Sequence, residues 1–137
     1  MRVTTTNPSI LFSIAALFNV AIAAFLLFAP GGAHELMVPG PEPQNFLLTY
    51  LLAVLVGTFG LGYWWVARDP QRNLSVIQLA IIGKTLVFIV VAVLFFQNGA
   101  TAFILALATA DLVFAALFLR AAQSLRPVAH DQKETHP

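Results

Sequence analysis

Two charged side chains interrupt long apolar stretches of this sequence. Lys84 lies within the apolar run 74–97 and Asp111 within the run 101–123. If these runs are membrane helices, each charge costs about 2.5–3.5 kcal/mol at the centre of the bilayer and needs a partner. Only three residues join the two runs, so the helices are antiparallel neighbours and both charges fall at about one depth. We predict that Lys84 and Asp111 form an ion pair near the bilayer midplane.

Two uncharged polar residues fall at a similar depth in the other runs. Asn19 is close to the centre of the run 8–29, and Thr58 is close to the centre of the run 44–67. We therefore predict one intramembrane polar centre formed by Lys84, Asp111, Asn19 and Thr58. Such a layer can act as structural glue, because hydrogen bonds between membrane helices contribute about 0.6 kcal/mol on average. Ionisable groups inside a membrane also commonly mark a proton, ion or substrate site, and both interpretations stay open.

The elements that must hold these residues follow from composition. Of 137 residues, 59% are apolar and only 9% are charged, against about 25% charged in a soluble domain. Each apolar run is near the ~20 residues that a helix needs to cross a bilayer. We predict an all-α integral membrane four-helix transmembrane bundle, a single domain over 1–126. Its spans are about 8–29, 44–67, 74–97 and 101–123, and a short polar tail follows at 127–137.

Positive charge gives this bundle an orientation. The connection 30–43 and the turn 98–100 contain no Lys or Arg, whereas every basic residue other than Lys84 flanks the opposite ends of the runs: Arg2, Arg68, Arg72, Arg120, Arg126 and Lys133. By the positive-inside rule both termini are cytoplasmic, in a multi-pass protein of the inner (plasma) membrane. In the alternative, the first run is a signal peptide cleaved near Ala33, which leaves three spans with the same orientation.

Small and aromatic residues suggest how the helices pack. Ala53 and Gly57 on the second run, and Ala102, Ala106 and Ala110 on the fourth, follow the small-xxx-small spacing that lets backbones approach closely. We expect these residues at helix contacts, either within the bundle or between copies. The segment Tyr63-Trp64-Trp65 suits an aromatic belt at the membrane surface. Tyr63, Gln78 and Thr85 are further candidates for the polar centre.

Several chemistries lack the residues that they need. The chain has no cysteine and no histidine within an apolar run, which disfavours thiolate, haem and di-iron sites. His34 and Glu35 are adjacent but do not supply the three or four ligands of a metal centre. The net charge of +1 is too small to indicate nucleic-acid binding. We therefore predict no catalytic set, no metal and no cofactor.

Four segments carry a family resemblance: Gly60-Leu61-Gly62-Tyr63, Arg68-Asp69-Pro70, Gly83-Lys84 and Asp111-Leu112-Val113-Phe114. With them the chain resembles small bacterial four-helix inner-membrane proteins, and it is similar in size and topology to DoxX-like proteins. Because DoxX-like proteins are associated with redox or quinone-linked membrane complexes, the resemblance implies an accessory role there. The absence of cysteine argues against a version with thiol redox chemistry.

Three functions remain for comparison. The first is a non-enzymatic accessory or scaffold subunit, with the lipid bilayer and either a second copy or a larger membrane complex as partners. The alternative is an oligomeric small-solute or proton-coupled carrier that uses Lys84 and Asp111 as its site. The third is an enzyme acting on a lipid or quinone, in which one of these two residues would do the acid–base work.

Overall fold

The computed structural model describes residues 7–125, which form five helices and no strand. Four are long: α1 (Pro8–Phe28), α3 (Leu47–Arg68), α4 (Leu74–Phe96) and α5 (Ala102–Leu125). Their 21 to 24 residues give lengths of roughly 32–36 Å at 1.5 Å per residue. All four are long and apolar enough to cross a membrane. Each begins and ends within three residues of the expected span, and the predicted tail lies outside the described residues.

Local sequence accounts for the helix ends. The Asn7 side chain accepts a hydrogen bond from the Ser9 amide at 3.0 Å, and Pro8 occupies the first turn of α1, where its missing N–H is not needed. At the α3–α4 turn the Asp69 carboxylate accepts from the Arg72 amide at 3.2 Å. At the α4–α5 turn Asn98 adopts a left-handed φ of 58°, a conformation that asparagine tolerates better than most residues.

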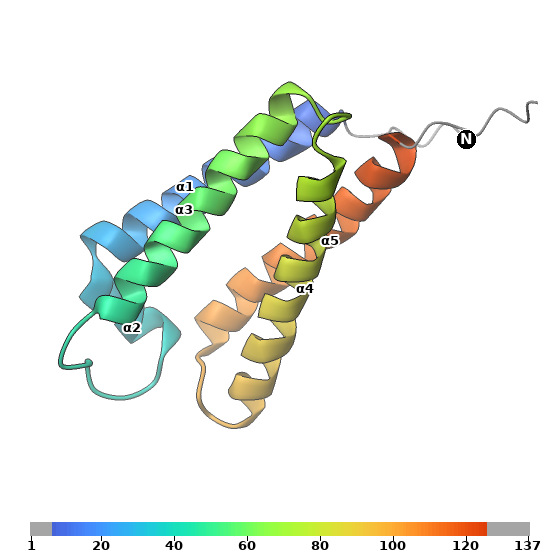
Figure 1. Cartoon of the computed structure of the whole chain (residues 1–137). Helices are drawn as coiled ribbons and strands as arrows, with labels where there is room; N and C mark the ends of the chain where they lie inside the picture. The colour runs from blue at the N-terminus through green and yellow to red at the C-terminus, as the bar shows by residue number, and fades with distance from the viewer. Residues whose placement is uncertain (1–6, 126–137) are drawn as a thin grey trace, which may run out of the picture.

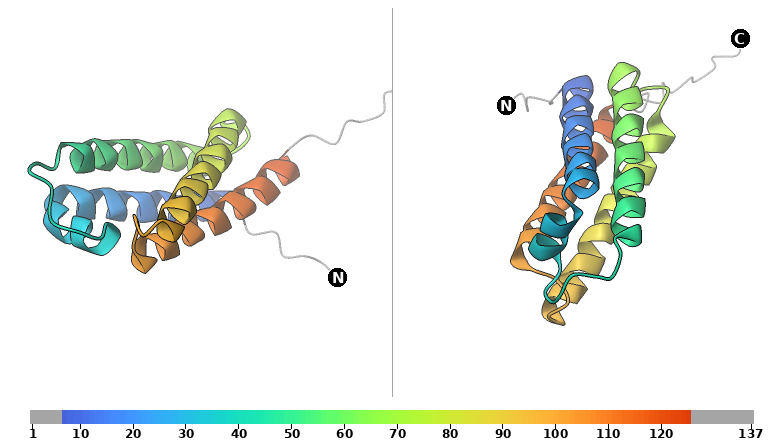
Figure 2. Two further views of the ribbon diagram at one scale, coloured as in Figure 1. Left: turned by 90° about the horizontal axis from the view of Figure 1, so that it is seen from below. Right: turned by 90° about the vertical axis from the view of Figure 1, so that its left-hand side faces the viewer.

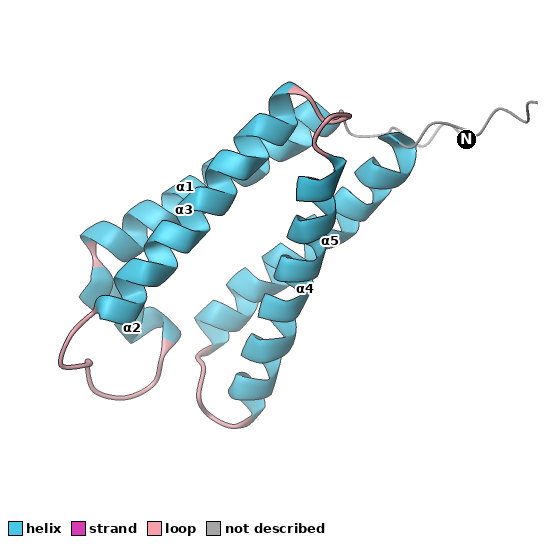
Figure 3. Cartoon of the chain, viewed as in Figure 1, coloured by secondary structure: helices cyan, strands magenta, loops and turns pink. Residues whose placement is uncertain are grey.

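A short helix, α2 (Pro30–Met37), occupies a region that the sequence indicated as an irregular connection. Pro30 ends α1 because the residue before a proline is pushed out of helical geometry, and Ala29 has φ −135° and ψ 56°. The same proline then fits the first turn of α2. Ala33 and Met37 of α2 are buried, and this packing compensates for the weak helix propensity of the two glycines. Figure 3 shows α2 between two loop segments.

The long helices form two antiparallel hairpins. α1 lies along α3, and α4 lies along α5, while the short turn between α3 and α4 joins the pairs (Figure 1). The two hairpins meet near that turn and diverge toward α2, as the two further views also show (Figure 2). At the far end α2 reaches the start of α5, where the Thr101 amide donates to the Met37 carbonyl at 3.2 Å.

Two separate clusters hold the hairpins together. The larger one lies near the α3–α4 turn and has an aromatic centre, in which the Phe12 and Phe118 rings stack at 4.3 Å and Tyr63 meets Phe118 edge-on at 5.4 Å. The smaller cluster lies beside α2 and includes Leu26, Met37 and Ala53. The outer face is apolar, with Leu48 80% and Phe96 84% exposed, which suits a lipid surrounding.

Candidate functional site

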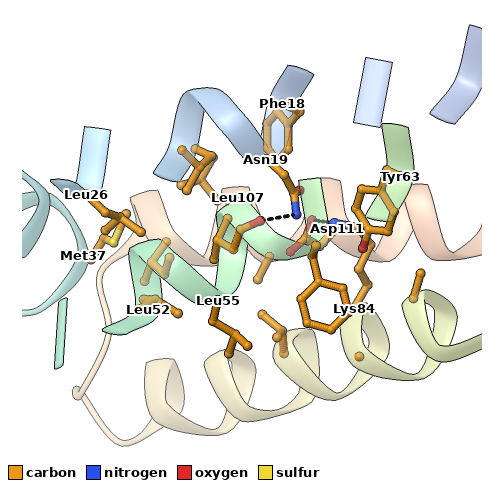
Figure 4. A pocket seen from close by; sticks show the side chains of 18 residues that line it. Phe18, Asn19, Leu26, Met37, Leu52, Leu55, Tyr63, Lys84, Leu107 and Asp111 are labelled. Carbon is orange, nitrogen blue, oxygen red and sulfur yellow. Dashed lines mark hydrogen bonds and ion pairs between the residues drawn. The ribbon is translucent and has the colours of Figure 1, made fainter. Parts of the chain in front are cut away.

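A cavity of about 210 Å³ lies between the two clusters. All four long helices and α2 contribute to its wall, which is almost entirely apolar. Leu26 and Met37 line one end, while Tyr63, Lys84 and Asp111 line the other (Figure 4). For comparison, an apolar cavity of about 150 Å³ stays dry and binds a benzene-sized molecule. The cavity is therefore large enough to hold part of a small organic ligand.

The predicted partners Lys84 and Asp111 meet at the polar end of this cavity. The Lys84 ammonium donates a hydrogen bond to Asp111 Oδ1 and forms an ion pair with it. Antiparallel helices joined by a tight turn bring the two residues to one level, as the sequence predicts. The Lys84 side chain is 6% exposed and that of Asp111 is 22% exposed. The carboxylate is thus the more open half of the pair.

Two aromatic rings complete the surroundings of Lys84. Its Nζ lies 5.5 Å from the ring centre of Tyr63 on α3 and 5.5 Å from that of Phe114 on α5. A cation within about 6 Å of an aromatic ring centre is attracted by the electron density of the ring face. The ammonium is therefore stabilised by one carboxylate and two rings, and the Tyr63 contact links it to the α1–α3 hairpin.

Asn19 belongs to the same cavity but bonds within its own hairpin. It is 7% exposed, and its Nδ2 donates to the Val56 carbonyl on α3 at 3.3 Å. In Figure 4 its side chain extends from α1 toward the polar end of the cavity. Asn19 thus lines the same cavity as Lys84 and Asp111, and its hydrogen bond goes to Val56.

Thr58 does not join this group. It is exposed, and its hydroxyl donates to the Val54 carbonyl of its own helix at 2.8 Å. Two residues along a helix are about 200° apart around the axis, so the face that presents Val56 to Asn19 turns Thr58 outward. Gln78 is also exposed, and the Thr85 hydroxyl bonds the Ile81 carbonyl on its own helix. The depth of a residue along its helix is therefore not enough to show which polar residues face the polar centre.

Tyr63 takes the place that Thr58 was expected to fill. It is 2% exposed and lines the cavity, whereas its neighbours Trp64 and Trp65 are 46% and 55% exposed. The aromatic-belt expectation therefore suits the two tryptophans but not Tyr63. The sequence signal was the spacing of Tyr63 from Gly60 and Val66, which are also buried and lie three residues away on one helix face.

The predicted packing residues divide into two groups. Ala53 is buried, and a Cβ added at Gly57 would lie 3.4 Å from that of Ala23 on α1, so the α3 pair serves the α1–α3 contact. Ala102 and Ala106 are exposed and Ala110 is half-buried, so this stripe is not a close contact within the chain. The α5 residues buried inside the bundle are instead Ala108, Ala115, Phe118, Ala121 and Ala122.

Gly60 is a packing residue that the sequence reasoning missed. A Cβ at this position would lie 3.2 Å from Asn19 Cβ and 3.3 Å from the Ala16 carbonyl oxygen. Because one of these atoms belongs to the backbone, α1 and α3 could not remain this close with a larger residue. Gly60 thereby allows the approach that brings Asn19 to Val56. It continues the Ala53 and Gly57 face, a regularity that could have identified it.

Elsewhere in residues 7–125 no group of three His, Asp or Glu side chains converges as metal ligands would. His34 Nε2 lies 3.0 Å from the Pro41 carbonyl oxygen, within the connection that follows α2. Comparison of the chain with protein-family models, with curated proteins and with solved structures finds no match. The resemblance to DoxX-like proteins therefore stays a prediction from the residues that carry it.

Proposed function

We propose that this chain is a small integral membrane protein whose central cavity binds or carries a lipid-soluble small molecule, without converting it chemically. The Lys84–Asp111 pair would be the polar end of that site. One observation carries the proposal: both residues of the pair line a cavity, and the Asp111 side chain is 22% exposed, instead of the pair being enclosed between close-packed helices. An ion pair at a cavity wall retains hydrogen-bonding capacity for a ligand.

The position of the pair in the fold supports this choice over a purely structural role. Lys84 and Asp111 lie in one hairpin, and the Asn19–Val56 bond lies in the other. Helices that a short turn already holds side by side have the least need of a costly ion pair to choose their neighbour. Contact between the hairpins is made mainly by the aromatic cluster and by α2.

For the membrane we propose the inner membrane of a bacterium, with both termini cytoplasmic. Arg68, Arg72 and Arg120 lie toward the end of the fold where α3 ends, α4 begins and α5 ends. The opposite end contains α2 and the α4–α5 turn and has no Lys or Arg in its connections. The positive-inside rule then supports this orientation, with the ion pair near the bilayer midplane.

A second candidate is an accessory subunit of a membrane complex or a homo-oligomer. The observation that favours it is the outward position of Ala102 and Ala106 on α5, where small side chains would allow a helix of another chain to approach. The two roles are compatible, because the outward alanine stripe and the cavity are on different faces of α5.

Gly83 offers a test of the cavity. It lines the cavity, and an added Cβ there meets no atom within 4 Å. The position therefore has room for a Cβ, and the longer side chain of Gly83→Leu should reduce the volume of the cavity. A matched control is Ala116→Leu, since Ala116 is exposed on α5 and does not line the cavity. Both variants and the wild type are purified into nanodiscs from native membranes and examined by native mass spectrometry.

The expected result is a retained small molecule in the wild type and in Ala116→Leu, reduced at least tenfold in Gly83→Leu. Equal thermal stability of the two variants would show that the loss is not caused by unfolding. Retention of the same molecule by Gly83→Leu would place binding elsewhere. If no sample retains a ligand although all are folded, the accessory-subunit role is favoured.

A further inference from the structure

We propose that the ligand of this cavity is an uncharged amphipathic lipid with a single alkyl chain, which enters sideways from the membrane between α3 and α4. This inference rests on the proposed function and adds the class of ligand and its route. Three observations carry it: the position of the opening, the charge balance of the polar end, and the apolar character of the other end.

The opening lies between α3 and α4. Leu52 and Leu55 on α3 and Val87 on α4 all line the cavity, yet each is 45–55% exposed. Residues that line a cavity and are also open to the surroundings form its rim. The two helices that supply this rim diverge below their connecting turn (Figure 1). Because the surroundings of spanning helices are lipid, a ligand would arrive from the bilayer and not from water.

Charge at the polar end is balanced. Lys84 and Asp111 are the only charged residues that line the cavity among the described residues, and they neutralise each other. An anionic head would compete with Asp111 for one ammonium and leave two like charges in a low-dielectric site. A cationic head would compete with Lys84 for the one carboxylate and leave two positive charges in the same site. Either arrangement leaves a buried charge without a full partner, which is strongly unfavourable.

A hydroxyl or carbonyl head meets neither penalty. A lysine ammonium has three N–H donors, and a carboxylate has about four lone-pair positions. The pair uses one donor and one oxygen for its own hydrogen bond. A hydroxyl on the ligand can accept from another Lys84 N–H and donate to Asp111, so both ions keep their partner and gain a bond.

The far end of the cavity suits an alkyl chain. Leu26, Met37, Ile104 and Leu107 line it, and Figure 4 shows Leu26 and Met37 well separated from Tyr63 and Lys84. Polar groups at one end and apolar ones at the other match a molecule with a head and a tail. At about 210 Å³ the volume only modestly exceeds that of a benzene-binding cavity, which favours one chain over two.

Photolabelling of the wild-type protein tests the proposal without altering the cavity. Three probes share one alkyl chain with a diazirine at its middle and differ in the head: a monoacylglycerol, an alkylsulfonate and an alkyltrimethylammonium. Each is added at low mole fraction to nanodiscs that contain the protein. After illumination the labelled residues are identified by peptide mass spectrometry. Gly83→Leu and Ala116→Leu are treated in parallel.

We expect the monoacylglycerol to label cavity-lining residues of α3, α4 and α5 at least fivefold more than either charged probe. Excess unlabelled monoacylglycerol should remove that labelling, Gly83→Leu should lose it, and Ala116→Leu should keep it. Stronger cavity labelling by a charged probe would overturn the ligand class but keep the cavity as a binding site. If the three probes label only outward-facing residues, this inference is wrong, and the retained ligand in native mass spectrometry decides the proposed function separately.

Discussion

Lys84 and Asp111 form their ion pair inside the α4–α5 hairpin, and at the polar end of the cavity the ammonium contacts the Tyr63 ring of the other hairpin. The charges therefore join helices that the chain already holds side by side. The cation–π contact between Lys84 and Tyr63 connects the ion pair to the α1–α3 hairpin. Removing either charge changes the wall of the cavity as well as the helix contact, and the following experiments separate these effects.

Loss of one ion should be more harmful than loss of both. Lys84→Met leaves the Asp111 carboxylate without its partner, and breaking a buried pair in this way costs about 3–5 kcal/mol. Lys84→Met combined with Asp111→Leu removes both charges and should recover most of that stability. Equilibrium unfolding in mixed detergent micelles measures the three proteins. A double variant as unstable as either single variant would show that the two residues act independently.

Two glycines should respond oppositely to the same substitution. Gly60→Ala places a Cβ 3.2–3.3 Å from Asn19, Val20 and the Ala16 carbonyl, so we expect about 1–3 kcal/mol of destabilisation from overpacking. Gly83→Ala meets nothing within 4 Å and should stabilise α4 by up to about 1 kcal/mol through helix propensity. Thermal unfolding in one detergent compares them. Equal effects of the two substitutions would contradict the α1–α3 packing.

The aromatic cluster should dominate the contact between the hairpins. Phe118 is fully buried and touches the rings of Phe12 and Tyr63, so Phe118→Ala should cost about 3–5 kcal/mol. Phe96→Ala is the control, because Phe96 is 84% exposed and its loss should change stability by no more than about 0.5 kcal/mol. The free energy of unfolding is measured for both variants. Comparable losses of stability at the two positions would contradict the claim that the aromatic cluster dominates the contact between the hairpins.

Asn19 and Thr58 should differ although the sequence placed them in one layer. Asn19→Ala removes a hydrogen bond between α1 and α3 and should cost about 0.6–1.7 kcal/mol. Thr58→Val removes a bond to its own helix from an exposed position and should change stability by less than about 0.5 kcal/mol. Equilibrium unfolding distinguishes them. A larger cost at Thr58 would mean that α3 is rotated from the position described.

The proposed orientation can be tested on a background without cysteine, because the chain has none. Glu35→Cys lies on α2 and Gln71→Cys in the α3–α4 turn, and both positions are exposed. A membrane-impermeant maleimide should label Glu35→Cys in intact cells but Gln71→Cys only after the inner membrane is opened. The reverse pattern would invert the topology and reject cytoplasmic termini.

Much of the architecture could be predicted from the sequence. Apolar runs of membrane-spanning length end at recognisable breakers such as Pro30, Pro70 and Asn98-Gly99, so the long helices were expected within a few residues of their positions. The Lys84–Asp111 pair was also predictable, because a tight turn and similar distances from it place both residues at one level. α2 was missed because Pro-Gly-Gly both stops one helix and can start another.

The rotation of each helix was decided only by tertiary packing. Nearly uniform apolar runs contain little information on which face turns inward, because lipid and protein core are similarly apolar and hydrophobicity does not distinguish them. The outward position of Thr58 and of the Ala102 and Ala106 stripe, and the inward position of Tyr63, therefore depend on close packing at Gly60 and in the aromatic cluster. The sequence alone determined how deep each polar residue lies along its helix. The cavity lies where the two hairpins diverge from their contact near the α3–α4 turn, with α2 contributing to its far end. No single segment contains this relationship between the hairpins.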